Sequence, residues 1–186
     1  MVAPRRPIAK ATRNTTGTRR ATRPPRNGCA PVPAPAGPDN TPPRITLTVL
    51  SSPGAPHFDT SDPADAAMGA CAPVRSFPAK LTLAASDASG IATLTLTSFP
   101  GGLATVSVAP ASATAALRRD PASATSRLTV TPHPPSGSVQ PNLLLTLTLD
   151  APSGVVAVAR DARGLAARLY QVDLRPGDGP LACGHR

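Results

Sequence analysis

Short segments in which apolar and polar residues alternate recur between residues 44 and 174, and this pattern constrains the fold more than any other feature of the sequence. Side chains along a β-strand point alternately to opposite faces, so each segment predicts a strand with one apolar face. The predicted strands span residues 44–50, 79–85, 91–98, 103–109, 127–131, 142–149, 154–160 and 166–174. Many short strands separated by turn residues predict an all-β sandwich or barrel.

The alternation also predicts which side chains form the core. The first strand presents Ile45, Leu47 and Val49 on one face, and the last presents Tyr170, Val172 and Leu174. The other inward residues are expected to be Leu81, Leu83, Leu94, Leu96, Val106, Val108, Leu128, Val130, Leu143, Leu145, Leu147 and Leu149. Residues 154–160 are apolar on both faces, which predicts a strand covered on both sides.

Composition agrees with a fold made of strands. Glutamate is absent, so all ten acidic residues are Asp, and the only lysines are Lys10 and Lys80. The charged residues that favour helices are therefore scarce, while Thr, Val and Leu, which suit strands or their apolar faces, are plentiful.

Residues 1–43 form a basic arm and linker that differs sharply from the rest of the chain. This arm carries eight basic side chains and one acid, Asp39, and so holds +7 of the formal net charge of +9. Rich in Arg, Pro and Thr and poor in large apolar residues, it cannot bury enough surface to offset the entropy of ordering. We expect it to be disordered, with an Ala/Pro spacer over residues 30–38.

The strands are expected to form one domain over residues 44–175, followed by a C-terminal tail over residues 176–186. Three connections within the domain are long, at residues 51–78, 110–126 and 132–141. The first two are rich in Ala, Ser, Asp and Pro, and loops longer than about 12–15 residues are usually functional or disordered. We expect disorder in those two.

Three short motifs resemble bacterial immunoglobulin-like domains. The run Asp-Asn-Thr-Pro-Pro-Arg-Ile over residues 39–45 is similar to the linker that enters their first strand. Residues 86–92, Ser-Asp-Ala-Ser-Gly-Ile-Ala, resemble a tight connection between their second and third strands, and residues 158–164, Val-Ala-Arg-Asp-Ala-Arg-Gly, one between their last two. The resemblance covers roughly residues 39–175. It implies an immunoglobulin-like antiparallel β-sandwich of about 7–8 strands, here without the buried Trp of antibody domains.

Two of these motifs contain Asp-x-x-Gly, which predicts a tight turn on physical grounds alone. An Asp side chain accepts a hydrogen bond from the backbone two residues further on, and Gly supplies a positive φ at no steric cost. Asp87 with Gly90, and Asp161 with Gly164, are therefore predicted to form turns.

The sequence contains three cysteines, an odd number. Cys71 and Cys183 each lie next to the end of a predicted strand, and a disulfide between them would contribute about 4–5 kcal/mol in an oxidising compartment. The alternative is two free thiols. Gly28-Cys29, followed by the Ala/Pro spacer, resembles the acylated start of a mature bacterial lipoprotein, although the residues before it are polar and basic rather than apolar.

No pattern in the sequence indicates catalysis, a metal site or a cofactor. The three histidines, His57, His133 and His185, fall in Pro/Gly-rich loops or at the terminus, and no Gly-x-Ser-x-Gly motif is present. The acids Asp59, Asp62 and Asp65 are spaced by three, unlike the alternate spacing of an EF-hand loop. We expect turn-forming roles for these acids.

These observations predict a non-catalytic structural, adhesion or spacer module of a bacterial envelope or secreted protein, with a protein or cell-surface partner of unknown identity. No export signal is recognised in the chain as given, and no segment is apolar enough to predict a membrane span. The alternative is a cytoplasmic protein that binds nucleic acid or another polyanion through the arm, although the arm has no aromatic residue. Its candidate contacts are Arg5, Arg6, Lys10, Arg13, Arg19, Arg20, Arg23 and Arg26.

Overall fold

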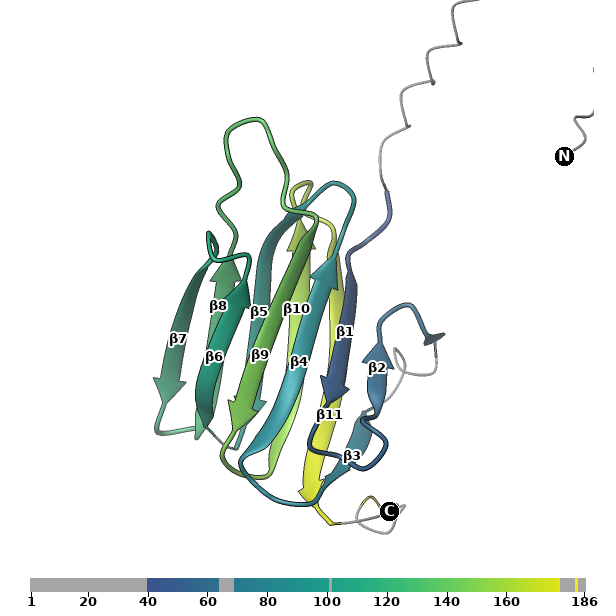
Figure 1. Cartoon of the computed structure of the whole chain (residues 1–186), viewed down its shortest axis with the longest axis vertical. Helices are drawn as coiled ribbons and strands as arrows, with labels where there is room; N and C mark the ends of the chain where they lie inside the picture. Colours follow the sequence, from purple (N-terminus) through teal and green to yellow (C-terminus); the bar gives the residue numbers. More distant parts are fainter. Residues whose placement is uncertain (1–39, 64–68, 101, 178–182, 184–186) are drawn as a thin grey trace, which may run out of the picture. The chain divides into compact units, whose positions relative to one another are not determined.

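Two β-sheets packed face to face make up the described part of the chain (Figure 1). The computed structural model describes residues 40–63, 69–100, 102–177 and Cys183. One sheet has five strands, in the order β2 (His57–Asp59), β1 (Arg44–Val49), β4 (Ala79–Ser86), β9 (Asn142–Leu149) and β6 (Leu103–Ala109). The other has six, in the order β3 (Ala70–Val74), β11 (Ala166–Pro176), β10 (Ser153–Asp161), β5 (Ile91–Phe99), β8 (Thr125–Thr131) and β7 (Thr114–Asp120). The predicted all-β sandwich is confirmed.

The core lies between the sheets and is almost entirely aliphatic. All eight predicted strands are present within two residues of their expected bounds. Their alternation places Ile45, Leu47 and Val49 of β1 inside, and all four of the odd-numbered leucines of β9 are buried to 1% exposure or less. No aromatic side chain is among the largest fully buried residues of the described chain. Burial of these leucines and valines contributes about 1.5–3 kcal/mol each.

The predicted inner face of the last strand needs one correction. Tyr170 is 44% exposed, whereas Leu169, Val172 and Leu174 are buried. The register between β10 and β11 shifts by one residue at this point, since Val155 pairs with Val172 but Ala157 pairs with Leu169. This β-bulge in β11 lets Leu169 and Val172 both face the core, and it turns Tyr170 outward.

The strand predicted to be covered on both faces is covered fully on one only. In β10, Val155, Ala157 and Ala159 are buried, while Val156 and Val158 are partly exposed. The second face carries no covering layer among the described residues, because the sandwich has two layers. Apolar residues on both faces therefore do not indicate a third layer here.

The connections 51–78 and 110–126, expected to be disordered, contain three further strands. β2 and β3 lie in the first connection and β7 in the second, so the described chain has eleven strands rather than about 7–8. β3 runs parallel to β11, so this sheet is mixed rather than wholly antiparallel. None of the three shows extended alternation, since β2 is three residues long, β3 contains Pro73 and every residue of β7 is exposed. The connection 132–141 has no strand.

Candidate interaction surface

The two Asp-x-x-Gly segments form tight turns at one end of the sandwich. Asp87 Oδ1 accepts hydrogen bonds from the backbone N–H of Ser89 at 2.7 Å and from its hydroxyl at 2.6 Å. Asp161 Oδ1 accepts from the N–H groups of Arg163 at 3.0 Å and Leu165 at 2.7 Å. Both Asp residues are buried, and the carboxylate of each accepts hydrogen bonds from donors within its own turn.

The two turns also contact each other. The hydroxyl of Ser89 lies 3.3 Å from Asp161 Oδ2, and the N–H of Ala162 donates to the carbonyl of Gly90 at 2.9 Å. Gly90 and Gly164 have φ angles of 95° and 92°, a region that side chains disfavour. These contacts give the four predicted turn residues a structural role.

Replacing each glycine by alanine is expected to separate backbone strain from crowding. At Gly164 nothing lies within 4 Å of an added Cβ, so Gly164→Ala costs the positive-φ strain of about 1–2 kcal/mol. At Gly90 the new Cβ would lie 2.9 Å from the Cβ of Val139, so Gly90→Ala costs about 2–4 kcal/mol. Urea unfolding of both variants measures the difference. Equal losses would show that the Val139 loop yields freely.

Cys71 of β3 and Cys183 are joined by a disulfide, with their Cα atoms 5.7 Å apart. The bond ties residue 183 to the strand that pairs with β11. Two other predicted sites, Cys29 and the eight basic residues of the arm, lie outside the described residues.

Asp59, the first of the three acids spaced by three, forms an ion pair with Arg44 and also accepts from Ser61 two residues further on. The Nε of Arg44 donates to Asp59 Oδ1 at 3.1 Å and Oδ2 at 2.9 Å, and the N–H of Ser61 donates to Oδ1 at 2.8 Å. The hydrogen bonds from Arg44 hold the pKa of Asp59 well below its ordinary value, against the opposing effect of burial, and Ser61 lowers the pKa further. Asp65 is outside the described residues, which contain no group of three potential metal ligands.

The pKa of Asp59 predicts a specific dependence of stability on pH. Because this pKa is lower in the folded than in the unfolded chain, the stabilisation is present above the ordinary value of 3.8 and is lost as the pH falls toward the folded value. Asp59→Asn is expected to lower the free energy of unfolding by roughly 1–2 kcal/mol at neutral pH, and by progressively less below pH ~4. Chemical denaturation at several pH values measures this. A loss that stays constant down to pH ~2 would contradict it.

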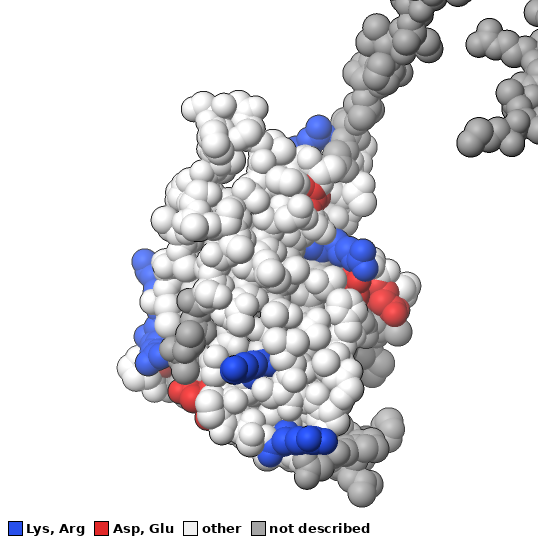
Figure 2. Space-filling view, in the orientation of Figure 1, with Lys and Arg blue, Asp and Glu red and all other residues white. Residues whose placement is uncertain are grey.

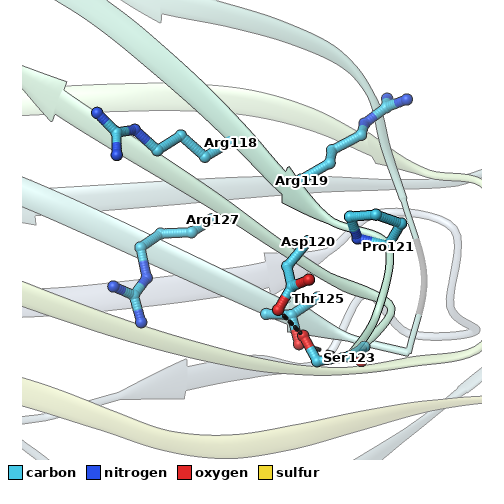
Figure 3. A pocket seen from close by; sticks show the side chains of 7 residues that line it. All are labelled: Arg118, Arg119, Asp120, Pro121, Ser123, Thr125 and Arg127. Carbon is cyan, nitrogen blue, oxygen red and sulfur yellow. Dashed lines mark hydrogen bonds between the residues drawn. The ribbon is translucent and has the colours of Figure 1, made fainter.

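Two arginines lie side by side at the open edge of the six-stranded sheet. Arg118 in β7 and Arg127 in β8 are directly opposite in the antiparallel register, and both are exposed. Residues directly opposite share a face, and buried Leu128 marks the other face as the inner one. Figure 3 shows both guanidinium groups extending to the same side, away from Arg119. Like charges directly opposite each other destabilise a sheet.

The neighbouring residues explain why these two guanidiniums are not neutralised locally. Arg119 points the other way, and its Nη2 donates to the carbonyl of Leu103 at 2.7 Å, linking β7 to β6. Asp120 accepts from the hydroxyl of Ser123 at 2.6 Å and from the N–H of Ala122 at 3.0 Å, and these bonds lower its pKa. Its carboxylate is thus committed to the β7–β8 turn.

Together these side chains line a pocket at the sheet edge, which we call the β7–β8 arginine site. Its lining residues are Arg118, Arg119, Asp120, Pro121, Ser123, Thr125 and Arg127. Figure 2 shows basic side chains along this margin, while the outer face of the five-stranded sheet is mostly uncharged. Arginine does not deprotonate in proteins, so the site suits binding of an anion rather than proton transfer.

The sequence reasoning missed this site because it expected disorder over residues 110–126. One local signal was available. Asp120-Pro121 is a dipeptide that favours the start of a turn, and the residues on each side of it are Thr, Ala, Leu, Val, Arg and Ser. A hairpin centred on that turn brings together two arginines that are nine positions apart.

Comparison with known proteins gives little further information. No protein-family model and no curated protein matches the sequence. Among solved structures, a non-cellulosomal cohesin from the hyperthermophilic archaeon Archaeoglobus fulgidus is similar over 59% of this chain and 88% of its own, with 7% identity and a TM-score of 0.38. So distant a likeness does not bear on the function of this chain. Among the described residues, no helix is long and apolar enough to span a membrane.

Proposed function

We propose that this chain is a non-catalytic, immunoglobulin-like module of a bacterial envelope or secreted protein, acting as an adhesion element or spacer. The disulfide between Cys71 and Cys183 carries this proposal, because such bonds form and persist in oxidising compartments. It joins residues 112 positions apart and so closes a loop that contains the strands from β3 to β11.

The strand order supports the immunoglobulin-like assignment. In immunoglobulin constant-type sandwiches, the first, second, fifth and fourth strands form one sheet and the third, sixth and seventh the other. When β2, β3, β7 and β8 are left out of the count, β1, β4, β9 and β6 are the first, second, fifth and fourth strands, and they lie side by side in one sheet in that order. The third, sixth and seventh strands are then β5, β10 and β11, which are neighbours in the other sheet. The remaining strands extend the sheet edges: β2 beside β1, β3 beside β11, and the β7–β8 hairpin beside β5.

The described histidines support a non-catalytic role. His57 comes nearest to a catalytic arrangement, since its Nδ1 lies 3.2 Å from the Thr48 hydroxyl and its Nε2 lies 3.8 Å from Asp59 Oδ2. The second distance is too long for a hydrogen bond, and Arg44 and Ser61 already occupy the carboxylate. A working triad needs the base oriented by its acid, so these three residues lack an essential contact.

Fractionation of the native cell, with intact mass and a thiol count of the recovered protein, tests the proposed location. We expect the protein in the envelope or the medium, with Cys71 and Cys183 oxidised. A mass that begins at or near Cys29 would add support for lipidation there. Recovery from the cytoplasm with every thiol reduced would overturn the proposal, and would direct attention to polyanion binding by the basic arm.

A further inference from the structure

We propose that strand β7 accepts an extended segment of an acidic partner protein, which adds to the sheet as a further strand and places a carboxylate against Arg118 and Arg127. This inference rests on the adhesion role proposed above and names the kind of partner. It combines two features of the same hairpin, an open strand edge and a pair of opposed arginines.

β7 is suited to strand addition. It ends the six-stranded sheet and pairs with β8 alone, through seven consecutive residues without a break in register. All of its residues are exposed. Edge strands are commonly protected by proline, by a bulge, by being very short or by charged side chains. β7 has none of the first three, and its charged residues are Arg118, Arg119 and Asp120. The two arginines repel a basic chain at this edge but attract an acidic one. Its outer edge therefore presents a row of backbone groups that an extended chain can pair with.

The charges on β7 and β8 select an acidic segment. The guanidiniums of Arg118 and Arg127 lie in one row across the two strands, and neither has an ion-pair partner among the described residues. A residue paired with Arg118 from an added strand would extend this same row. A carboxylate there removes the repulsion between the arginines and forms charge-assisted hydrogen bonds, which guanidinium groups make with good geometry.

The same hairpin is poorly suited to nucleic acid. β7 and β8 contain no aromatic side chain on which a base could stack. Two guanidiniums in one row also match one or two carboxylates better than a track of phosphates, which gains its affinity from many cations. The observations therefore favour a protein segment as the occupant.

The alternation along β7 specifies the segment further. Leu117, which is 40% exposed, lies on the opposite face from Arg118. In an added strand, adjacent residues face opposite sides, so one faces Leu117 and the next faces Arg118. The preferred segment is thus an extended one in which an apolar residue adjoins an acidic one.

A synthetic peptide in which Asp alternates with Val, carrying a fluorophore, tests this with the full-length protein. Fluorescence anisotropy should show binding that weakens with salt and is lost when Asn replaces Asp in the peptide. The variant Arg118→Gln/Arg127→Gln should bind about ten-fold more weakly. The control variant Arg160→Gln/Arg168→Gln removes the same charge from exposed positions of β10 and β11, which lie beyond β5 from the β7–β8 hairpin, and should bind as the wild type does.

Backbone pairing is tested with two N-methylated forms of the same peptide, methylated at alternate positions. Because a strand offers its N–H groups to opposite sides in turn, one form should bind and the other should not. Equal binding of both forms would overturn strand addition.

A photo-crosslinking version of the peptide locates the contact, which is expected within β7 and β8. Crosslinks to residues 1–39, or equal weakening in the two arginine variants, would show attraction to general positive charge and would overturn the proposal. The proposal would also be overturned if a DNA oligonucleotide displaced the peptide and if its own binding were weakened by the Arg118→Gln/Arg127→Gln change as much as that of the peptide. Peptide binding is measured independently of where the protein lies in the cell. If the protein is found in the cytoplasm and still binds the peptide at β7, only the proposed compartment is refuted.

Discussion

Replacing both Cys71 and Cys183 by Ser is expected to lower the free energy of unfolding by about 4–5 kcal/mol. The disulfide joins residues 112 positions apart, so it restricts the unfolded chain from β3 to β11. In the chain-entropy model, the stabilisation by a crosslink grows with the length of the loop it closes. Guanidinium unfolding of the variant and the wild type measures the loss.

Two controls accompany this prediction. The wild type under reducing conditions should match the double variant, whereas Cys29→Ser should leave stability unchanged, because Cys29 is not part of the bond. A thiol count on unfolded, unreduced protein should find one free thiol. Three free thiols, or equal stability with and without reductant, would contradict the predicted contribution of the bond.

Leu145→Ala is expected to lower the free energy of unfolding by about 3–5 kcal/mol. This loss from a single side chain is similar to that expected on removal of the disulfide. Leu145 is completely buried in β9, between Leu83 of β4 and Val108 of β6 in the register. Truncation removes apolar contacts and leaves a cavity, and the neighbouring aliphatic side chains fill it only in part. Urea unfolding measures the loss.

The adjacent residue provides a matched control. Leu144 is 47% exposed on the other face of the same strand, so Leu144→Ala should change stability by no more than about 0.5 kcal/mol. The pair compares the same substitution on two faces of one strand. Similar losses for both variants would mean that the outer face of β9 is covered in solution, by another copy or by another part of the chain.

The core could be predicted from sequence because its signal is local. A strand buried on one face alternates with period two whatever its partners are, so the leucines of β9 and the apolar residues of β1 were identified without knowledge of the pairing. Where this regularity is interrupted, the prediction was wrong. Tyr170 faces outward because a bulge shifts the phase of β11, and a bulge depends on the partner strand.

The candidate site was not predictable in the same way. β7 has no buried face, so its sequence has none of the alternation that marked the other strands. Its order comes from backbone pairing with β8, and that pairing alone places Arg118 opposite Arg127. The two cysteines had a similar ambiguity, since an odd number of cysteines in non-periodic segments leaves bonded and free thiols equally open.

Local patterns in the sequence are enough to predict that this chain forms strands with aliphatic inner faces, and that two Asp-x-x-Gly turns connect some of them. The folded structure was needed to show which strands are neighbours, where β11 changes phase, how Cys71 meets Cys183, and that two arginines meet at an open edge. The physical reason is one of range. Alternation and turn chemistry act between residues close in sequence, whereas strand order and register are set by pairings between distant segments, which leave little trace in either segment alone.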